Sequence, residues 1–180
     1  LVLDARYEKV RHGGSVIDCA VLVAMGVREE DGKRTLLGVS VSLSEAEVHW
    51  RAFLEGLRQR GLQVTKLITS DDHAGLRAAR RAVFPNLPWQ RCQFHLQQNA
   101  QAYVPSVALR PQVARDLRSV FNTAERGEAL ERLNCELRRR TRVAMLFPNE
   151  APLLRLVSAM AAEISEEWET GRIYLNPESE

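Results

Sequence analysis

Acidic side chains stand at the ends of two short apolar runs in this sequence, where metal-dependent phosphoryl transfer would need them. Asp4 ends the run that opens the chain, and Asp71 and Asp72 directly follow the run 64–70. Two divalent ions about 4 Å apart can hold the attacking and leaving oxygens of such a reaction in line. Ions such as Mg²⁺ take oxygen ligands and keep several waters, so a few carboxylates suffice. These acids predict a site for two Mg²⁺ or Mn²⁺ ions if the fold brings them together.

Each of these aspartates also has an ordinary structural alternative. An aspartate that follows a strand is often a helix N-cap, so Asp71 or Asp72 is as readily interpreted as the cap of a helix beginning at His73. Asp4 is harder to dismiss, because burying an unpaired carboxylate in an apolar strand costs free energy.

A third acid is expected from a later helix. Three glutamates have a suitable position in the chain: Glu131, Glu136 and Glu163. Glu131 lies beside a stripe of three leucines at helical spacing. That periodicity alone favours a solvated surface glutamate, so the residues themselves leave the third acid open.

The elements that carry these acids follow the order β-β-β-α-β-α-β, with helices after them. Hydrophobic runs and turn signals predict strands over 1–7, 16–27, 35–43, 64–70 and 89–92, and helices after Ser44 and over 73–84. Ser44 with Glu47 predicts a capping box, and Gly61 predicts a helix stop. The predicted fold class is α/β (α+β), with a mixed sheet of the RNase H-like kind, in which strands one and four are neighbours. Many α+β domains share this order, so the order alone is weak evidence.

Composition and charge describe a globular chain with unevenly distributed charge. The 180 residues are 45% hydrophobic and 27% charged, and no run of 18 apolar residues occurs, so we expect no membrane span. Three widely spaced cysteines favour a reducing cytoplasm over a disulfide framework. The net charge is only +2, but residues 106–142 hold nine arginines against five acids, and 143–180 hold two against seven. A basic middle segment is typical of a DNA-facing surface, although solvated helix faces explain it equally well.

Four arginines concentrate this basic charge: Arg138, Arg139, Arg140 and Arg142. Arginine binds phosphates in a bidentate manner and without reading base sequence. A solvated face is the alternative, but these arginines follow Glu131 on the same predicted helix. Their closeness to a candidate catalytic acid favours DNA binding.

Several motifs resemble those of the Mutator family of bacterial insertion-sequence transposases. Residues 4–11 resemble the family's first acidic motif, 70–76 its second and 130–134 its third. The array Asp-x-x-x-Gly…Phe-Pro…Gln-x-Cys-x-x-His, which runs from Asp71 to His95, resembles the family's signature. The resemblance extends almost from end to end of the chain.

This resemblance implies the catalytic domain of a DDE-type transposase on an RNase H-like fold, which cuts and joins DNA during transposition. It implies that Asp4, Asp71 and Glu131 are catalytic and hold the metal ions. The implied partners are DNA, as element ends and target, and a second copy in a homo-oligomer, in the bacterial cytoplasm at the nucleoid. We expect residues 1–104 to form the core with the first two acids, and 105–180 a helical part of the same core with the third.

Cys92-x-x-His95 also invites a zinc hypothesis. A structural zinc site needs about four ligands, and the remaining cysteines and histidines show no paired spacing. We therefore favour packing, or the placement of DNA near the acids, as the role of Cys92 and His95.

The chain departs from the family pattern in two places. It begins in the first strand without a methionine, so we expect a piece of a longer protein without the family's N-terminal DNA-reading region. The family's long helical insertion between His95 and Glu131 is missing, so the chain resembles an internally deleted copy. The alternative function is therefore an inactive or regulatory remnant that binds DNA without catalysis. Another RNase H-like nuclease is disfavoured, because it would not need the Cys-x-x-His signature.

Overall fold

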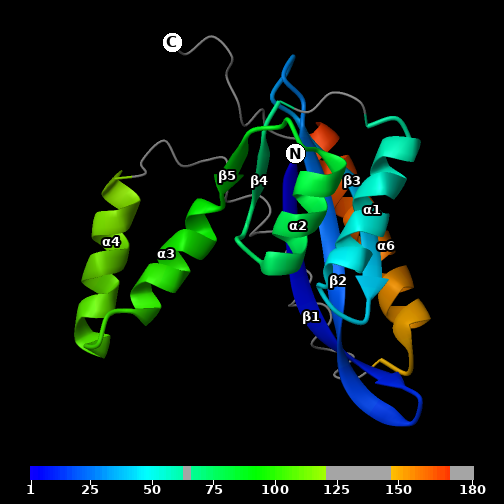
Figure 1. The fold of residues 1–180 in the computed structure, drawn as a ribbon, viewed down its shortest axis with the longest axis horizontal. Helices are drawn as coiled ribbons and strands as arrows, with labels where there is room; N and C mark the ends of the chain where they lie inside the picture. The colour runs from blue at the N-terminus through cyan, green and yellow to red at the C-terminus, as the bar shows by residue number, and fades with distance from the viewer. Residues whose placement is uncertain (63–65, 121–146, 171–180) are drawn as a thin grey trace.

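A computed structural model describes residues 1–62, 66–120 and 147–170, and its centre is a mixed sheet in the order β3-β2-β1-β4-β5 (Figure 1). The strands are β1 (Val2–His12), β2 (Ser15–Val27), β3 (Arg34–Ser42), β4 (Ile68–Ser70) and β5 (Trp89–Arg91). The helical elements are α1 (Glu47–Gln59), α2 (Ala74–Val83), α3 (Gln93–Ala102), the 3₁₀ turn η1 (Val107–Leu109), α4 (Arg110–Val120) and α6 (Glu150–Thr170). The predicted α/β class and the order β-β-β-α-β-α-β are confirmed.

The first three strands form an antiparallel meander because short turns reverse the chain. β1 and β2 pair without interruption up to His12 and Ser15. Between them Gly13 and Gly14 have φ values of 55° and 84°. Such left-handed backbone favours glycine and is typical of two-residue hairpin turns. The turn expected at this place is confirmed.

Helices cover both faces of the sheet (Figure 1). On one face α1 and α2 bury Trp50 and Leu76 in a cluster that includes Leu3 of β1. On the other face α6 buries Val157 in a second cluster, which includes Val23 of β2. Alternate residues of a strand point to opposite faces, so β1 and β2 contribute to both cores.

Two local predictions were wrong. Ser44 and Glu47 form no capping box, because α1 has Ala46 as its N-cap residue and no side-chain cap bond. The Ser44 hydroxyl instead accepts a hydrogen bond from the Ala46 N–H at 3.3 Å, a local turn that competes with helix capping. The first strand also continues beyond 1–7, because its pairing with β2 extends to His12.

The segment from α3 to α4 forms a helical arm that stands apart from the sheet (Figure 1). α3 buries none of its residues, and Tyr103 and Val107 are exposed. After the arm, the next described residue is Phe147, which accepts a hydrogen bond from the Arg11 N–H of β1 at 2.8 Å. The chain thus returns to the strand that carries Asp4. Within the described ranges, no helix has the length and apolar character of a membrane span.

Candidate metal centre

Strand pairing brings Asp4 and Asp71 to the same level of the sheet. β1 and β4 are parallel neighbours, with Val2 opposite Thr69. Asp4 and Asp71 each lie two residues further along. Paired strands lie about 4.8 Å apart, so the two aspartates leave adjacent strands side by side. The prediction that strands one and four are neighbours is confirmed.

Asp4 is a buried carboxylate on the α6 side of the sheet. Its side chain is 7% exposed, and the Ala5 N–H donates a hydrogen bond to Oδ1 at 2.9 Å. Leu3 belongs to the cluster under α1 and α2, and Ala5 packs against it, so Asp4, between them, points to the opposite face. A carboxylate is retained in such a place only with compensating partners.

The side chains of Asp71 and Asp72, just before α2, have different partners. The N-cap residue of α2 is His73, with no side-chain cap bond, so neither aspartate is the predicted N-cap. Asp71 Oδ1 accepts a hydrogen bond from the His73 N–H at 3.3 Å, which bends the chain between strand and helix. Asp72 turns to α2 and pairs with Arg77 at 3.1 Å. Of the two, Asp71 is the one that stays at the strand end.

The Cys-x-x-His motif lies against Asp4. His95, in the first turn of α3, places Nε2 3.9 Å from Asp4 Oδ1. The pKa of His95 is raised to about 9, mainly by hydrogen bonding with Cys92 and also by the charges of Asp4 and Asp71, against the opposing effect of burial. His95 Nδ1 is buried and has no hydrogen-bond partner. The motif therefore belongs to the same site as the acids.

One further buried carboxylate, near Asp71, was not predicted. Glu45, in the loop before α1, is 11% exposed and lies 3.8 Å from His73 Nδ1. Burial raises the pKa of Glu45, and the charge of Asp71 raises it further, while His73 lowers it. No spacing marks Glu45 in the sequence, because the packing of α2 against its loop brings it near His73 and Asp71.

Gly75 explains how that loop comes so close. A Cβ on Gly75 would lie 2.1 Å from the Glu45 carbonyl oxygen and 2.9 Å from the Glu47 nitrogen. Side-chain flexibility cannot relieve such an overlap, because both atoms are backbone. The glycine of the Asp-x-x-x-Gly motif thus lets the first turn of α2 rest on the loop.

The donors present fit a hard cation in part. Asp4 and Asp71 offer carboxylate oxygens, the ligands that Mg²⁺ and Mn²⁺ prefer. One or two carboxylates are enough for Mg²⁺, because water molecules complete its coordination shell. In the described ranges, no three His, Cys, Asp or Glu side chains are grouped so as to hold a metal ion. A third protein ligand would have to come from elsewhere in the chain.

Several predicted residues lie outside the described ranges. They are Glu131, Glu136, Arg138, Arg139, Arg140 and Arg142. Glu163 lies within α6, where its backbone alone is described. The structure therefore brings together Asp4, Asp71 and His95 and leaves the third acid and the basic segment as predictions.

The chain matches a known protein family along nearly its whole length. The model of the family "Transposase, Mutator family" matches residues 1–129 and 125–171. The chain belongs to the Mutator family of transposases. The predicted family membership is confirmed.

Curated members of the Mutator family resemble the chain over nearly its whole length. The transposase for insertion sequence element IS406 of Burkholderia multivorans is 48% identical over 98% of this chain and 58% of its own length. The transposase for ISRM5 of Rhizobium meliloti is 35% identical over 98% of this chain and 56% of its own. The chain thus spans just over half the length of these relatives.

Family members carry internal residues that this chain lacks. The alignment with the IS406 transposase covers 224 residues, more than the 180 of this chain. The two parts matched by the family model meet at residues 125–129. The missing residues therefore belong just after α4, which agrees with the predicted internal deletion before Glu131.

Solved structures resemble the chain only weakly. The catalytic core domain of HTLV-2 integrase in complex with magnesium is 11% identical, with a TM-score of 0.28, over 66% of this chain and 82% of that one. A simian T-cell lymphotropic virus intasome gives 8% identity and a TM-score of 0.30 over 63% and 46%. Scores this low transfer neither a fold nor a residue.

Proposed function

We propose that this chain is the catalytic core of an insertion-sequence transposase, which cleaves and joins DNA strands at a site built on Asp4, Asp71 and Glu131. One observation carries the proposal: two carboxylates lie at the same level of adjacent parallel strands, and His95 of the Cys-x-x-His motif lies 3.9 Å from one of them, Asp4. Family membership supports the reaction class. The strand order and the helices on both faces support an RNase H-like fold, which would carry the three acids of a DDE-type transposase.

The chemistry assigned to this site is metal-assisted displacement at a phosphate. Bound Mg²⁺ or Mn²⁺, as a pair, would supply charge neutralisation and activation of a nucleophile. Asp4 would hold the ions from within the central strand β1, where strand pairing fixes its backbone, and Asp71 from the turn at His73 that follows β4. His95 would place its imidazole beside Asp4.

The third acid is within reach of this site despite the missing residues. Phe147 is anchored beside Val10 of β1, six residues from Asp4, a distance of about 20 Å along a strand. Glu131 precedes Phe147 by 16 residues. Even the short rise of a helix, about 1.5 Å per residue, lets 16 residues span about 24 Å. The return of the chain to β1 therefore supports a role for Glu131.

Nicking of supercoiled plasmid with Mn²⁺ tests the proposal. We expect weak nicking by the chain and none by Glu131→Gln, because small misplacements of a reacting group are costly and the missing residues directly precede Glu131. Equal nicking by the two proteins would show that Glu131 is not part of the catalytic site. Metal binding without any nicking would favour the second candidate below.

The DNA surface is assigned to Arg138, Arg139, Arg140 and Arg142. Neutralised phosphates release counterions, so binding should weaken steeply as salt increases. Replacement of all four by glutamine should reduce the slope of log K against log salt by about three to four, given about 0.9 per phosphate contact in duplex DNA. Fluorescence anisotropy with an arbitrary duplex measures the slope. An unchanged slope would place the DNA surface elsewhere.

A second candidate function is a regulatory remnant that binds DNA without cleaving it. The missing internal residues near 125–129 favour it. Both candidates place the protein on DNA in the bacterial cytoplasm, with a second copy as the remaining proposed partner. The division into a core of 1–104 and a helical part of 105–180 stays a prediction.

A further inference from the structure

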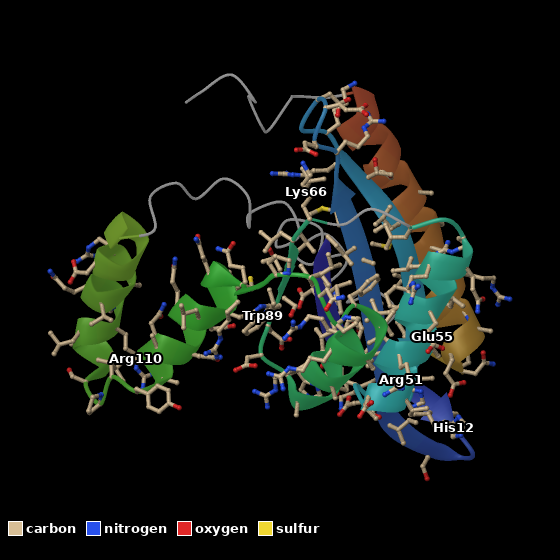
Figure 2. All side chains as sticks on the ribbon, turned by 45° about the horizontal axis from the view of Figure 1, so that its top comes forward. His12, Arg51, Glu55, Lys66, Trp89 and Arg110 are labelled. Carbon is tan, nitrogen blue, oxygen red and sulfur yellow. The ribbon has the colours of Figure 1, made fainter. Side chains whose placement is uncertain are left out.

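We propose that Trp89 is a positioning residue for the metal site, acting through the Ser70 hydroxyl on Asp71. This inference rests on the proposed metal-binding role of Asp4 and Asp71. Trp89 opens β5, and Figure 2 labels it at the edge of the sheet beside α2.

A short chain of hydrogen bonds links the indole to Asp71. Trp89 Nε1–H donates to Ser70 Oγ at 3.0 Å. The same hydroxyl donates to the Asp71 carbonyl oxygen at 2.7 Å. A serine hydroxyl rotates to suit its partners, so the indole bond sets its direction. The hydroxyl in turn fixes the peptide that follows Asp71.

The surroundings make this link hard to replace by water. Ser70 is 1% exposed, and its own carbonyl oxygen accepts a hydrogen bond from the Cys92 N–H at 2.6 Å. The Trp89 ring is held in turn by the Arg80 guanidinium, which lies 4.8 Å from the ring centroid and belongs to a residue 7% exposed. A cation over an aromatic face is an attractive contact that fixes the ring.

The position of Asp71 depends on this link because β4 is short. β4 has three residues, Ile68–Ser70, so Asp71 lies beyond the last paired residue. The strand ladder does not hold it, whereas Asp4 lies inside an eleven-residue strand. Partners that orient a metal ligand commonly change metal affinity by about 10-fold to 100-fold. Trp89 and Ser70 together provide such an orienting contact for Asp71.

A double-mutant cycle on Mn²⁺ affinity tests the inference. Trp89→Phe keeps the ring and removes the N–H, and Ser70→Ala removes the hydroxyl. We expect each to raise the Mn²⁺ dissociation constant about 10-fold, the low end of that range, and the double variant to raise it about 10-fold as well. Titration calorimetry measures the constants, and thermal unfolding verifies that each variant is folded.

Matched variants separate this role from general stability and from the proposed function. Val83→Ala, a core truncation in α2, should lower the melting temperature and leave Mn²⁺ affinity unchanged. Unchanged Mn²⁺ affinity in Trp89→Phe would overturn the inference, and so would effects that multiply to about 100-fold in the double variant. The metal site itself would still stand in either case if Asp71→Ala lost Mn²⁺ binding. Absence of Mn²⁺ binding to the parent chain would overturn both.

Discussion

Asp4→Asn should abolish Mn²⁺ binding while leaving the chain folded. Asparagine has nearly the shape of aspartate, so strand pairing and the α6-side core are kept. The substitution removes the charged oxygen donor from a side chain that is only 7% exposed. We expect the dissociation constant to rise by more than about 100-fold, beyond the range for residues that only orient a ligand. Calorimetric titration measures the change.

The neighbouring pair Asp71 and Asp72 supplies the matched control. Asp71→Asn should weaken Mn²⁺ binding as strongly as Asp4→Asn. Asp72→Asn should leave binding unchanged, because that carboxylate pairs with Arg77 on α2. Retained binding in Asp4→Asn, or equal losses at Asp71 and Asp72, would contradict the assignment.

Gly75→Ala should produce the largest loss of stability among single methyl additions to the described glycines. The added Cβ would lie 2.1 Å from the Glu45 carbonyl oxygen, so the first turn of α2 or the loop before α1 must move. Overpacking typically costs about 1–3 kcal/mol and sometimes more. We expect about 3 kcal/mol from urea unfolding, at the upper end because both colliding atoms are backbone. Mn²⁺ affinity should fall as well, since Asp71 immediately precedes the displaced turn.

Gly56→Ala is the control for that substitution. Gly56 lies inside α1, and nothing stands within 4 Å of an added Cβ. Alanine is favoured over glycine in a helix by up to about 1 kcal/mol, so this variant should be as stable as the parent or more stable. Equal stability of the Gly75 and Gly56 variants would show that the contact with Glu45 is not as tight as described.

Local patterns were enough to predict the part of the fold that carries Asp4 and Asp71. Apolar runs with glycine turns predict the meander, and the RNase H-like sheet expected from the element order has β4 beside β1. Asp4 and Asp71 then lie at the same level, because each follows the paired residues Val2 and Thr69 by two positions. For Cys92 and His95 the sequence favoured packing or the placement of DNA near the acids, but it could not predict the contact of His95 with Asp4, which depends on where α3 begins after β5.

Non-local packing accounts for what the sequence did not reveal. The loop of Glu45 lies close to the start of α2 because α2 lacks a Cβ at Gly75. The predicted cap at Ser44 failed because the hydroxyl bonds the nearer amide of Ala46. A hydrophobic pattern encodes neither a loop resting on a helix nor a choice between two adjacent N–H donors.

Anomalous scattering from a crystal of the chain grown with Mn²⁺ is the most direct test of the central claim, that Asp4 and Asp71 share a metal site. The account predicts a peak between the two carboxylates, with oxygens of both at about 2.1 Å, the distance typical of small hard cations. A peak held by other residues, or none at saturating Mn²⁺, would contradict it.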